Sequence, residues 1–228
     1  MIIKVCGMRD GENIRQVAEL GVDWIGMIFW PKSPRYVTMI PSHAGIIPDR
    51  GSLSPKDQQL SPLRVGVFVD EMAQNIITRV VNFQLDLVQL HGHETPTLIR
   101  NLRHTLADIR PVKFIKAISV ASREDIETYK DYADCVDYLL FDTKCPMVGG
   151  SGNQFDWTVL DAYDGNLPFL LSGGIGPDDA ERVKSFLTSR LSPLTSKKCI
   201  GIDLNSKFEV EPAIKDIEKL KCFLEKVK

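Results

Sequence analysis

The sequence predicts an α/β fold, a single (β/α)₈ (TIM) barrel that takes up residues 1–228 as one domain. Short apolar runs recur along the chain at intervals of roughly 20 to 40 residues. Amphipathic helical patterns lie between most of these runs, and the units continue evenly to the C-terminus. The alternative is a doubly wound sheet, which usually has fewer strands. The number and even spread of the units therefore favour the barrel.

The apolar runs are short and uniformly hydrophobic, as expected for parallel strands that are covered on both faces. The eight expected strands are Ile2–Val5, Trp24–Phe29, Val65–Val69, Leu85–Leu90, Phe114–Ile118, Tyr138–Phe141, Phe169–Leu171 and Cys199–Ile202.

Apolar residues spaced three or four apart predict helices between the strands. The expected helices are Glu12–Leu20, Ala73–Phe83, Thr97–Leu106, Ser122–Tyr132, a segment that opens at Pro177, and Ala213–Val227. Ser122 suits a helix cap, and Pro177 suits a first helical turn. The stretch Thr38–Pro62 is rich in proline and glycine, so we expect a short or distorted second helix there, followed by an exposed loop.

Composition excludes several classes of protein. The formal net charge is −2, which removes any global electrostatic argument for binding nucleic acid or an anionic membrane. No apolar stretch is long enough for a membrane span, and the first residues do not resemble a secretion signal, so a cytoplasmic location is expected. The cysteines number 5, are scattered and include no CxxC pair, which argues against disulfides and against zinc.

Glycine-rich segments follow the late strands, where a barrel of this kind binds its ligand. Glycine lets backbone N–H groups approach a phosphate closely, whereas the plainer alternative is a set of tight strand-to-helix turns. Because three such segments converge on one mouth, we expect a phosphorylated small molecule as ligand. The candidate residues are Gly149, Gly150, Ser151, Gly152, Ser172, Gly173, Gly174, Asn205 and Ser206.

Two residues at strand ends are candidates for proton transfer. Cys6 lies between the first strand and the first helix, and a thiol near a helix N-terminus can have a lowered pKa. The alternative for Cys6 is a buried structural cysteine. Asp142 follows an apolar strand, and a carboxyl in a partly buried mouth can have a raised pKa and act as an acid. Its alternative is a carboxylate that caps the next loop.

Arg35 and His91 are candidates for binding a ligand. Arg35 stands between Pro34 and Tyr36, and its planar fork suits a carboxylate; a surface salt bridge is the alternative. His91 and His93 form an HxH pair, but no further ligands lie at a suitable spacing, so we expect polar loop residues and no metal site.

These segments together resemble the phosphoribosylanthranilate isomerase family. The resemblance rests on seven motifs in the family's order: KVCG at Lys4–Gly7, FWPKSPRYV from Phe29, VQLHG at Val88–Gly92, FDT at Phe141–Thr143, GGSGNQFDW from Gly149, LSGGI at Leu171–Ile175, and GIDLNSKFE from Gly201. Each motif is weak alone, but together they cover nearly the whole chain.

The resemblance implies an Amadori rearrangement of N-(5′-phosphoribosyl)anthranilate in tryptophan biosynthesis. Asp142 would protonate the ribose ring oxygen, and Cys6 would remove the C2′ proton. Arg35 would hold the anthranilate carboxylate, and the glycine-containing loops would hold the phosphate. His91 would also bind the substrate. No metal or cofactor is implied, and we expect a monomer or a homodimer. Lys207 departs from the family, which usually has a glycine there.

Rival interpretations remain at this point. Other phosphosugar barrels would need lysine with glutamate, or a pair of aspartates, as catalysts, and Cys6 with Asp142 fits neither well. A sensor that binds a phosphorylated ligand without catalysis would keep the glycine loops, although Cys6, Asp142 and Arg35 argue against it. A thiol-redox protein would need a second cysteine near Cys6.

Overall fold

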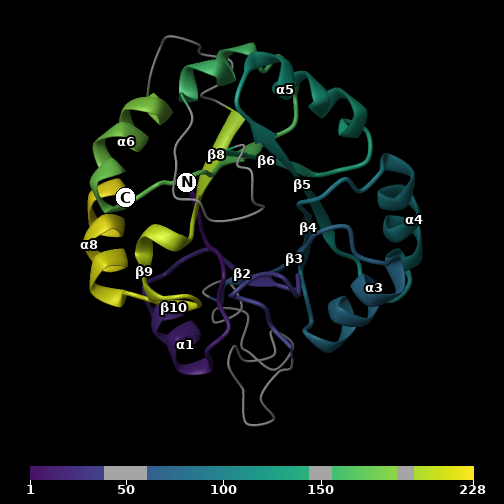
Figure 1. Cartoon of the computed structure of the whole chain (residues 1–228), viewed down its shortest axis with the longest axis horizontal. Helices are drawn as coiled ribbons and strands as arrows, with labels where there is room; N and C mark the ends of the chain where they lie inside the picture. Colours follow the sequence, from purple (N-terminus) through teal and green to yellow (C-terminus); the bar gives the residue numbers. More distant parts are fainter. Residues whose placement is uncertain (39–60, 144–155, 189–197) are drawn as a thin grey trace.

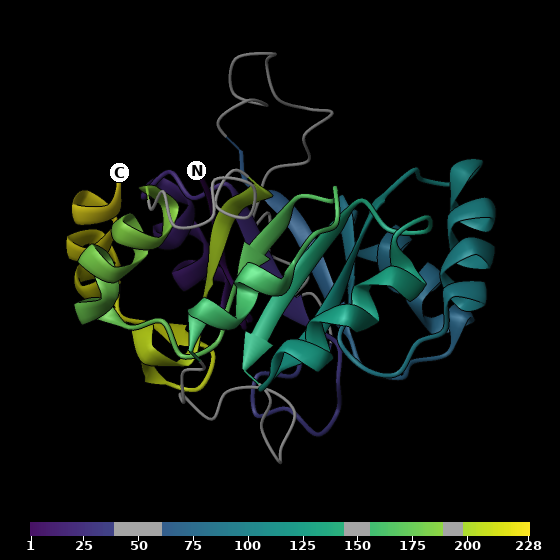
Figure 2. The ribbon, with the colours of Figure 1, turned by 90° about the horizontal axis from the view of Figure 1, so that it is seen from above.

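The structure is a computed structural model that describes residues 1–38, 61–143, 156–188 and 198–228. In these residues the strands form a closed parallel barrel in the order β1 to β8, which confirms the expected fold. Six of the helices, α1, α3, α4, α5, α6 and α8, lie outside the strands and surround them (Figure 1). The chain termini lie at the same end of the barrel (Figure 2).

All eight expected strands are present. They are β1 (Ile2–Val5), β2 (Trp24–Ile28), β3 (Leu63–Phe68), β4 (Leu87–Leu90), β5 (Lys113–Val120), β6 (Tyr138–Thr143), β7 (Phe169–Leu171) and β8 (Cys199–Leu204). Strands β6 and β8 run beyond their apolar runs, so Asp142 and Asp203 lie within strands. Asp142 pairs with Ser119 of β5, because backbone pairing continues whether or not the side chain is apolar.

The early helices form where the sequence predicts them. They are α1 (Gly11–Glu19), α3 (Ala73–Asn82) and α4 (Pro96–Ala107). The Asp10 side chain caps α1 by accepting from the backbone N–H of Asn13, and Thr95 caps α4 in the same way. Of the proline-rich stretch expected to hold a distorted second helix, residues 39–60 lie outside the described residues.

The later helices differ from expectation in three places. The helix expected over Ser122–Tyr132 is divided into α5 (Arg123–Glu127) and the 3₁₀ helix η2 (Thr128–Tyr132). Pro177 opens the 3₁₀ helix η4 (Pro177–Asp179), which leads into α6 (Ala180–Thr188). A further 3₁₀ helix, η3 (Trp157–Ala162), precedes β7 and was not expected.

The start expected for the last helix was wrong. The chain after the 3₁₀ turn η5 (Ser206–Phe208) forms a small antiparallel hairpin from β9 (Glu209–Glu211) and β10 (Ile214–Lys215). Between its strands, Ala213 has a positive φ of 75°, which no helix accommodates. Helix α8 (Ile217–Val227) therefore starts later, where Asp216 accepts from the N–H of Lys219.

The barrel interior and the layer between strands and helices are separate apolar clusters. The interior cluster consists of Cys6, Trp24, Val65, Val67, Leu87, Ile115, Ala117, Leu140 and Leu170. Side chains alternate along a strand, so the residues two positions from these also face inward. Lys4, Gln89, Asp142 and Ser172 thus share the inner face of the wall with Cys6, Leu87, Leu140 and Leu170. No helix within the described ranges is long and apolar enough to cross a bilayer.

Candidate active site

Polar side chains gather at the carboxyl ends of the strands, on the inner face of the barrel. They come from β1 (Cys6 directly follows it), from the residue after β4 (His91), from β6 (Asp142), from the residue after β7 (Ser172) and from β8 (Asp203). Contacts link them across strands: Nε2 of His91 lies 3.3 Å from Oδ2 of Asp142, and Oγ of Ser172 lies 3.5 Å from Oδ2 of Asp203. The fold thus brings together residues that are far apart in the sequence.

Cys6 is almost completely buried at the base of this group. Its exposed fraction is 3%, and its backbone N–H donates to the carbonyl of Leu204 in β8. Burial raises the pKa of the Cys6 thiol, whereas the ammonium groups of Lys4 and Lys215 lower it and so offset part of the rise. The expectation of a lowered pKa was therefore wrong, because desolvation outweighs the favourable charges. The alternative, a buried structural cysteine, is correct in that the thiol is buried. The thiol also faces charged groups, namely Lys4, Asp203 and Lys215.

Lys4 is the charged residue beside that thiol. Its side chain is fully buried, its Nζ lies 2.8 Å from Oδ1 of Asp203, and it also interacts with the Cys6 sulfur. Burial by itself lowers the pKa of Lys4, but the Asp203 carboxylate and the Cys6 sulfur raise it above its ordinary value. Lys4 therefore places a permanent positive charge next to the thiol, where it stabilises negative charge on sulfur.

Asp142 forms one end of a short chain of polar side chains. Its Oδ1 accepts from the backbone N–H of Thr143 at 2.8 Å, and its Oδ2 faces His91. Nδ1 of His91 lies in turn 3.3 Å from Nε2 of Gln89. The Asp142 side chain is 19% exposed, so the carboxyl is partly shielded and still open to a ligand in the mouth.

Arg35 is held by a carboxylate of its own chain. Its Nε and Nη2 donate to Oε1 and Oε2 of Glu209 at 2.8 and 2.6 Å, in a bidentate pair that is largely buried. Glu209 also accepts from Lys215 at 2.7 Å, and these cations hold the pKa of Glu209 below its ordinary value although burial opposes them. The alternative of a salt bridge is thus correct as to the ion pair, but the pair is not on the surface, because Arg35 is only 8% exposed.

Gly7 explains why Arg35 can lie so close to the first strand. Its φ of 77° is left-handed, and a Cβ there would stand 2.5 Å from Cδ of Arg35 and 2.6 Å from Oδ1 of Asn205. Only glycine fits both the conformation and the space. The Gly7 turn thus seats Arg35 and Asn205 over the end of β1.

The glycine turn after β7 packs against the end of β6. Gly173 and Gly174 have φ values of 90° and 69°, and a Cβ on Gly173 would stand 2.2 Å from Oγ1 of Thr143. In the loop after β8, Oδ1 of Asn205 accepts from Nζ of Lys215 at 2.9 Å, and Ser206 opens η5. The stem of Lys207 lies beside Gly176, which precedes η4. Gly149, Gly150, Ser151 and Gly152 lie outside the described residues.

A family model described as N-(5'phosphoribosyl)anthranilate (PRA) isomerase matches residues 3–226. This chain belongs to the PRA isomerase family. The N-(5'-phosphoribosyl)anthranilate isomerase of Parabacteroides distasonis is 44% identical over 227 residues, which are 100% of this chain and 93% of that protein. The one of Phocaeicola vulgatus is 40% identical over 228 residues, 100% of this chain and 98% of that protein.

Solved structures of PRA isomerases have the same fold. The enzyme from Thermotoga maritima has a TM-score of 0.78 at 32% identity, and the match covers 100% of this chain and 98% of that chain. Another PRA isomerase was solved in complex with reduced 1-(o-carboxyphenylamino)-1-deoxyribulose 5-phosphate. It matches with a TM-score of 0.71 at 27% identity, with the same coverage.

Several polar and charged residues of this mouth were missed from the sequence. Lys4 and Gln89 lie two residues before Cys6 and His91, so the alternation of strand side chains was a usable signal for them. For Asp203 the signal was a carboxylate in the last strand-end motif. No local pattern pointed to Glu209 or Lys215, because Glu209 binds Arg35, 174 residues away, and Lys215 hydrogen-bonds Asn13, 202 residues away.

A further buried ion pair supports the loop that follows His91. Nζ of Lys116 lies 2.9 Å from Oε2 of Glu94 and donates to the carbonyl of Gly92 at 2.6 Å. Glu94 also accepts from the backbone N–H groups of Gly92 and Asp70. The pair therefore fixes the backbone of the residue that follows His91.

The HxH histidines face different partners. His93 is exposed and contacts Asp70, whereas His91 faces Asp142 inside the mouth. In the four described ranges, no group of three or more histidine, cysteine, aspartate or glutamate residues is arranged to hold a metal ion.

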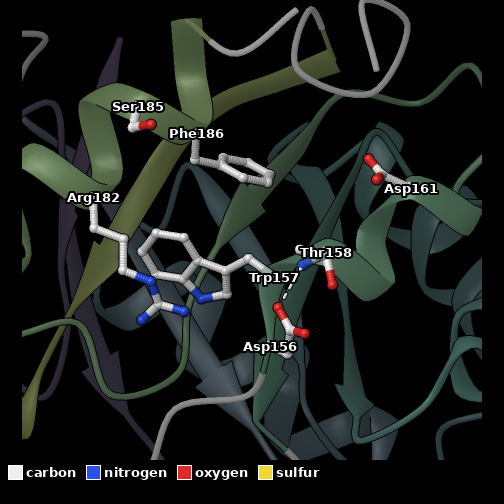
Figure 3. Close-up of a pocket in the computed structure, with 7 residues that line it drawn as sticks. All are labelled: Asp156, Trp157, Thr158, Asp161, Arg182, Ser185 and Phe186. Carbon is white, nitrogen blue, oxygen red and sulfur yellow. Dashed lines mark hydrogen bonds between the residues drawn. The ribbon is translucent and has the colours of Figure 1, made fainter. Parts of the chain in front are cut away.

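A pocket outside the barrel wall lies between η3 and α6 and is distinct from the mouth (Figure 3). The guanidinium of Arg182 lies 3.8 Å from the centre of the Trp157 ring, and Phe186 meets the same indole edge-on. None of the candidate catalytic residues lines this pocket.

Proposed function

We propose that this chain isomerises N-(5′-phosphoribosyl)anthranilate to 1-(2-carboxyphenylamino)-1-deoxyribulose 5-phosphate, with Asp142 as the general acid and Cys6 as the general base. Membership of the PRA isomerase family carries the choice of reaction. The observation that carries the roles is the placement of a thiol and a carboxyl on the inner face of one barrel mouth, on β1 and β6.

The reaction needs an acid and a base that work in sequence. Asp142 gives its proton to the ribose ring oxygen, the ring opens, and the anthranilate nitrogen forms a Schiff base with C1′. Cys6 then takes the proton from C2′, and the electrons of that C–H bond move into the iminium to give the enamine. Acid or base catalysis of this kind contributes typically ~10²–10⁴-fold each.

The buried surroundings of Cys6 suit this task. A thiol whose pKa is raised by burial gives a stronger base once it has lost its proton. The Lys4 and Lys215 ammonium groups offset the cost of the negative charge, so the thiolate forms in a preorganised field. The substrate iminium is the electron sink, so the proposal uses no metal or cofactor.

Arg35 is proposed to bind the anthranilate carboxylate. Among the described residues, Glu209 binds Nε and Nη2 of the Arg35 guanidinium. The third nitrogen, Nη1, is left to donate to the carboxylate of the substrate. We propose the turns at Ser172–Gly174 and Asn205–Ser206 as phosphate-binding backbone, in agreement with their place after β7 and β8.

We also propose that residues 1–228 act as one catalytic domain and that the protein is located in the cytoplasm. We expect the protein to be a monomer or a homodimer. One solved relative, 27% identical, is described as monomers generated from the dimeric enzyme of Thermotoga maritima. Sedimentation velocity of the purified chain distinguishes the two states.

The test is the enzyme-dependent loss of phosphoribosylanthranilate fluorescence without added metal or cofactor. The wild-type chain is expected to accelerate this loss, and Cys6→Ser and Asp142→Asn should each lower turnover by at least ~10²-fold while still binding the reduced product analogue. Cys222→Ser is the matched control, because that thiol is exposed. Near-normal turnover in Cys6→Ser or Asp142→Asn would refute the assigned role, and no acceleration by wild type would refute the activity.

A further inference from the structure

Gln89 is a buried amide with no role in the proton transfers assigned to Asp142 and Cys6. It lies on β4, faces the barrel interior and is only 1% exposed. Its Nε2 lies 3.3 Å from Nδ1 of His91. Its Oε1 is buried without a hydrogen-bond partner among the described residues. Buried polar atoms are nearly always paired, so this unpaired oxygen calls for an explanation.

The amide contact decides where the ring hydrogen of a neutral His91 sits. An amide nitrogen is only a donor, so Nδ1 of His91 must accept and the ring hydrogen must be on Nε2. Nε2 is the atom that lies 3.3 Å from Oδ2 of Asp142. Gln89 thereby directs the hydrogen of His91 at the carboxyl group that we assign as the acid.

The His91 ring has little freedom to choose another arrangement. The backbone N–H of His91 donates to the carbonyl of Phe68 at 2.8 Å, and Lys116 with Glu94 fixes the next residue. A half-turn of the Gln89 amide would offer Nδ1 an acceptor in place of a donor. The orientation of the amide therefore sets which ring nitrogen carries the hydrogen, and Oε1 is left unpaired because Nε2 takes the place beside the ring.

We propose that Gln89 is a positioning residue that keeps the ring hydrogen of His91 on Nε2, directed at Oδ2 of Asp142. That hydrogen stabilises the carboxylate that Asp142 becomes when it gives up its proton. This inference rests on the proposed function, in which Asp142 is the general acid.

Asp142 loses its proton to the ribose ring oxygen and becomes a carboxylate. His91 keeps its single ring hydrogen on Nε2 and donates it as a hydrogen bond to Oδ2 of that carboxylate. The substrate gains one proton at the ring oxygen and loses one at C2′ to Cys6. The enzyme therefore returns to its starting state when one proton passes from Cys6 to Asp142 by way of water at the mouth.

The test compares Gln89→Met, which removes donor and acceptor, with Gln89→Glu, which offers only an acceptor. The readout is the pair of ring ¹⁵N signals of His91, assigned with His91→Asn, in alkaline buffer. Wild type should show the hydrogen on Nε2, Gln89→Met a mixture of both tautomers, and Gln89→Glu the hydrogen on Nδ1. Leu87→Met is the control, because it repacks the same inner face two residues earlier.

Turnover is the second readout. Gln89→Met should lower kcat by roughly 2- to 10-fold with little change in KM, as expected for one lost hydrogen bond. Leu87→Met should leave the ring signals and kcat as in wild type. Unchanged ring signals or unchanged kcat in Gln89→Met overturn the proposal and leave the assignment of Asp142 intact. Full activity in Asp142→Asn instead removes the proposed function, while the ring signals still report whether Gln89 sets the tautomer.

Discussion

Lys4 and Asp203 form a buried ion pair, 2.8 Å long, that joins the first strand of the barrel to the last. The two residues are register partners in the β1–β8 pairing, so the closure of the barrel itself brings them together. The side chain of Lys4 is fully buried and that of Asp203 is 7% exposed. The ammonium group is therefore shared between the Asp203 carboxylate and the sulfur of Cys6.

Changes to this pair should move the pKa of Cys6 in opposite directions. Asp203 raises the pKa of the thiol and Lys4 lowers it, in addition to the larger effect of burial. Asp203→Asn should therefore let the thiolate form at lower pH than in wild type, and Lys4→Met should require higher pH. The thiolate ultraviolet absorbance, followed against pH with Cys6→Ser as the blank, measures both. Shifts in the same direction would contradict this electrostatic account.

Gly26 should be required for the position of the Cys6 thiol. A Cβ on Gly26 would stand 2.7 Å from Sγ of Cys6, so Gly26→Ala must displace the sulfur or the strand. Misplacement of a catalytic group by about 1 Å can cost ~10²-fold in rate, so kcat should fall by ~10-fold or more. The measurement is kcat together with the free energy of unfolding.

Gly66→Ala is the matched control for this prediction. A Cβ there would stand 2.4 Å from Cδ1 of Leu85 and 2.8 Å from Cε2 of Phe68, which are apolar side chains and not the thiol. It should lower stability without a comparable fall in kcat. An equal loss of kcat in both variants would show that the Gly26 effect is general strain.

Glu209→Gln should destabilise the protein in a pH-dependent way. The variant leaves Arg35 and Lys215 without their shared carboxylate, and breaking a buried pair costs about 3–5 kcal/mol. Arg35 and Lys215 hold the pKa of Glu209 below its ordinary value, so its charge stabilises the fold above the unfolded pKa, about 4.3. That stabilisation disappears as pH falls through the folded-state pKa.

The difference in the free energy of unfolding between wild type and Glu209→Gln should thus be largest near neutral pH and shrink below about pH 4. Urea unfolding of both proteins at a series of pH values measures it. A difference that grew with acidity would mean that the carboxylate does not stabilise this cluster.

Arg35→Lys should weaken substrate binding more than catalysis. An ammonium group cannot hold Glu209 through two parallel bonds and also present a third donor to a second carboxylate. We expect KM for the substrate to rise by roughly 10-fold or more, the size of a hydrogen bond to a charged group, with a smaller change in kcat. Steady-state kinetics on the folded variant measures both constants. Glu209→Gln serves as comparison, because it disturbs the Arg35–Glu209 ion pair and keeps the guanidinium. An equal rise in KM in Glu209→Gln would mean that the loss of this ion pair, and not the loss of the guanidinium, weakens substrate binding.

Local patterns were sufficient for much of the fold. The eight apolar runs located every strand of the barrel, since a parallel strand covered on both faces must be apolar along its length. Helix ends were less certain. Ala213 lies in an apolar pattern that suits a helix, yet the hairpin it joins is stabilised by Glu209, whose Oε1 accepts from the Ala213 N–H. A contact of that kind overrides local preference.

The sequence by itself determined the barrel strands, the strand ends that form the mouth and the resemblance to the PRA isomerase family, because these depend on apolar periodicity and on motifs that are local in the chain. Only the tertiary structure decided the charge state of the groups around Cys6 and the partner of Arg35. The carboxylates that pair with Lys4 and Arg35 lie 199 and 174 residues away along the chain. The direction of a pKa shift depends on burial and on such distant charges, and both exist only once the barrel is closed.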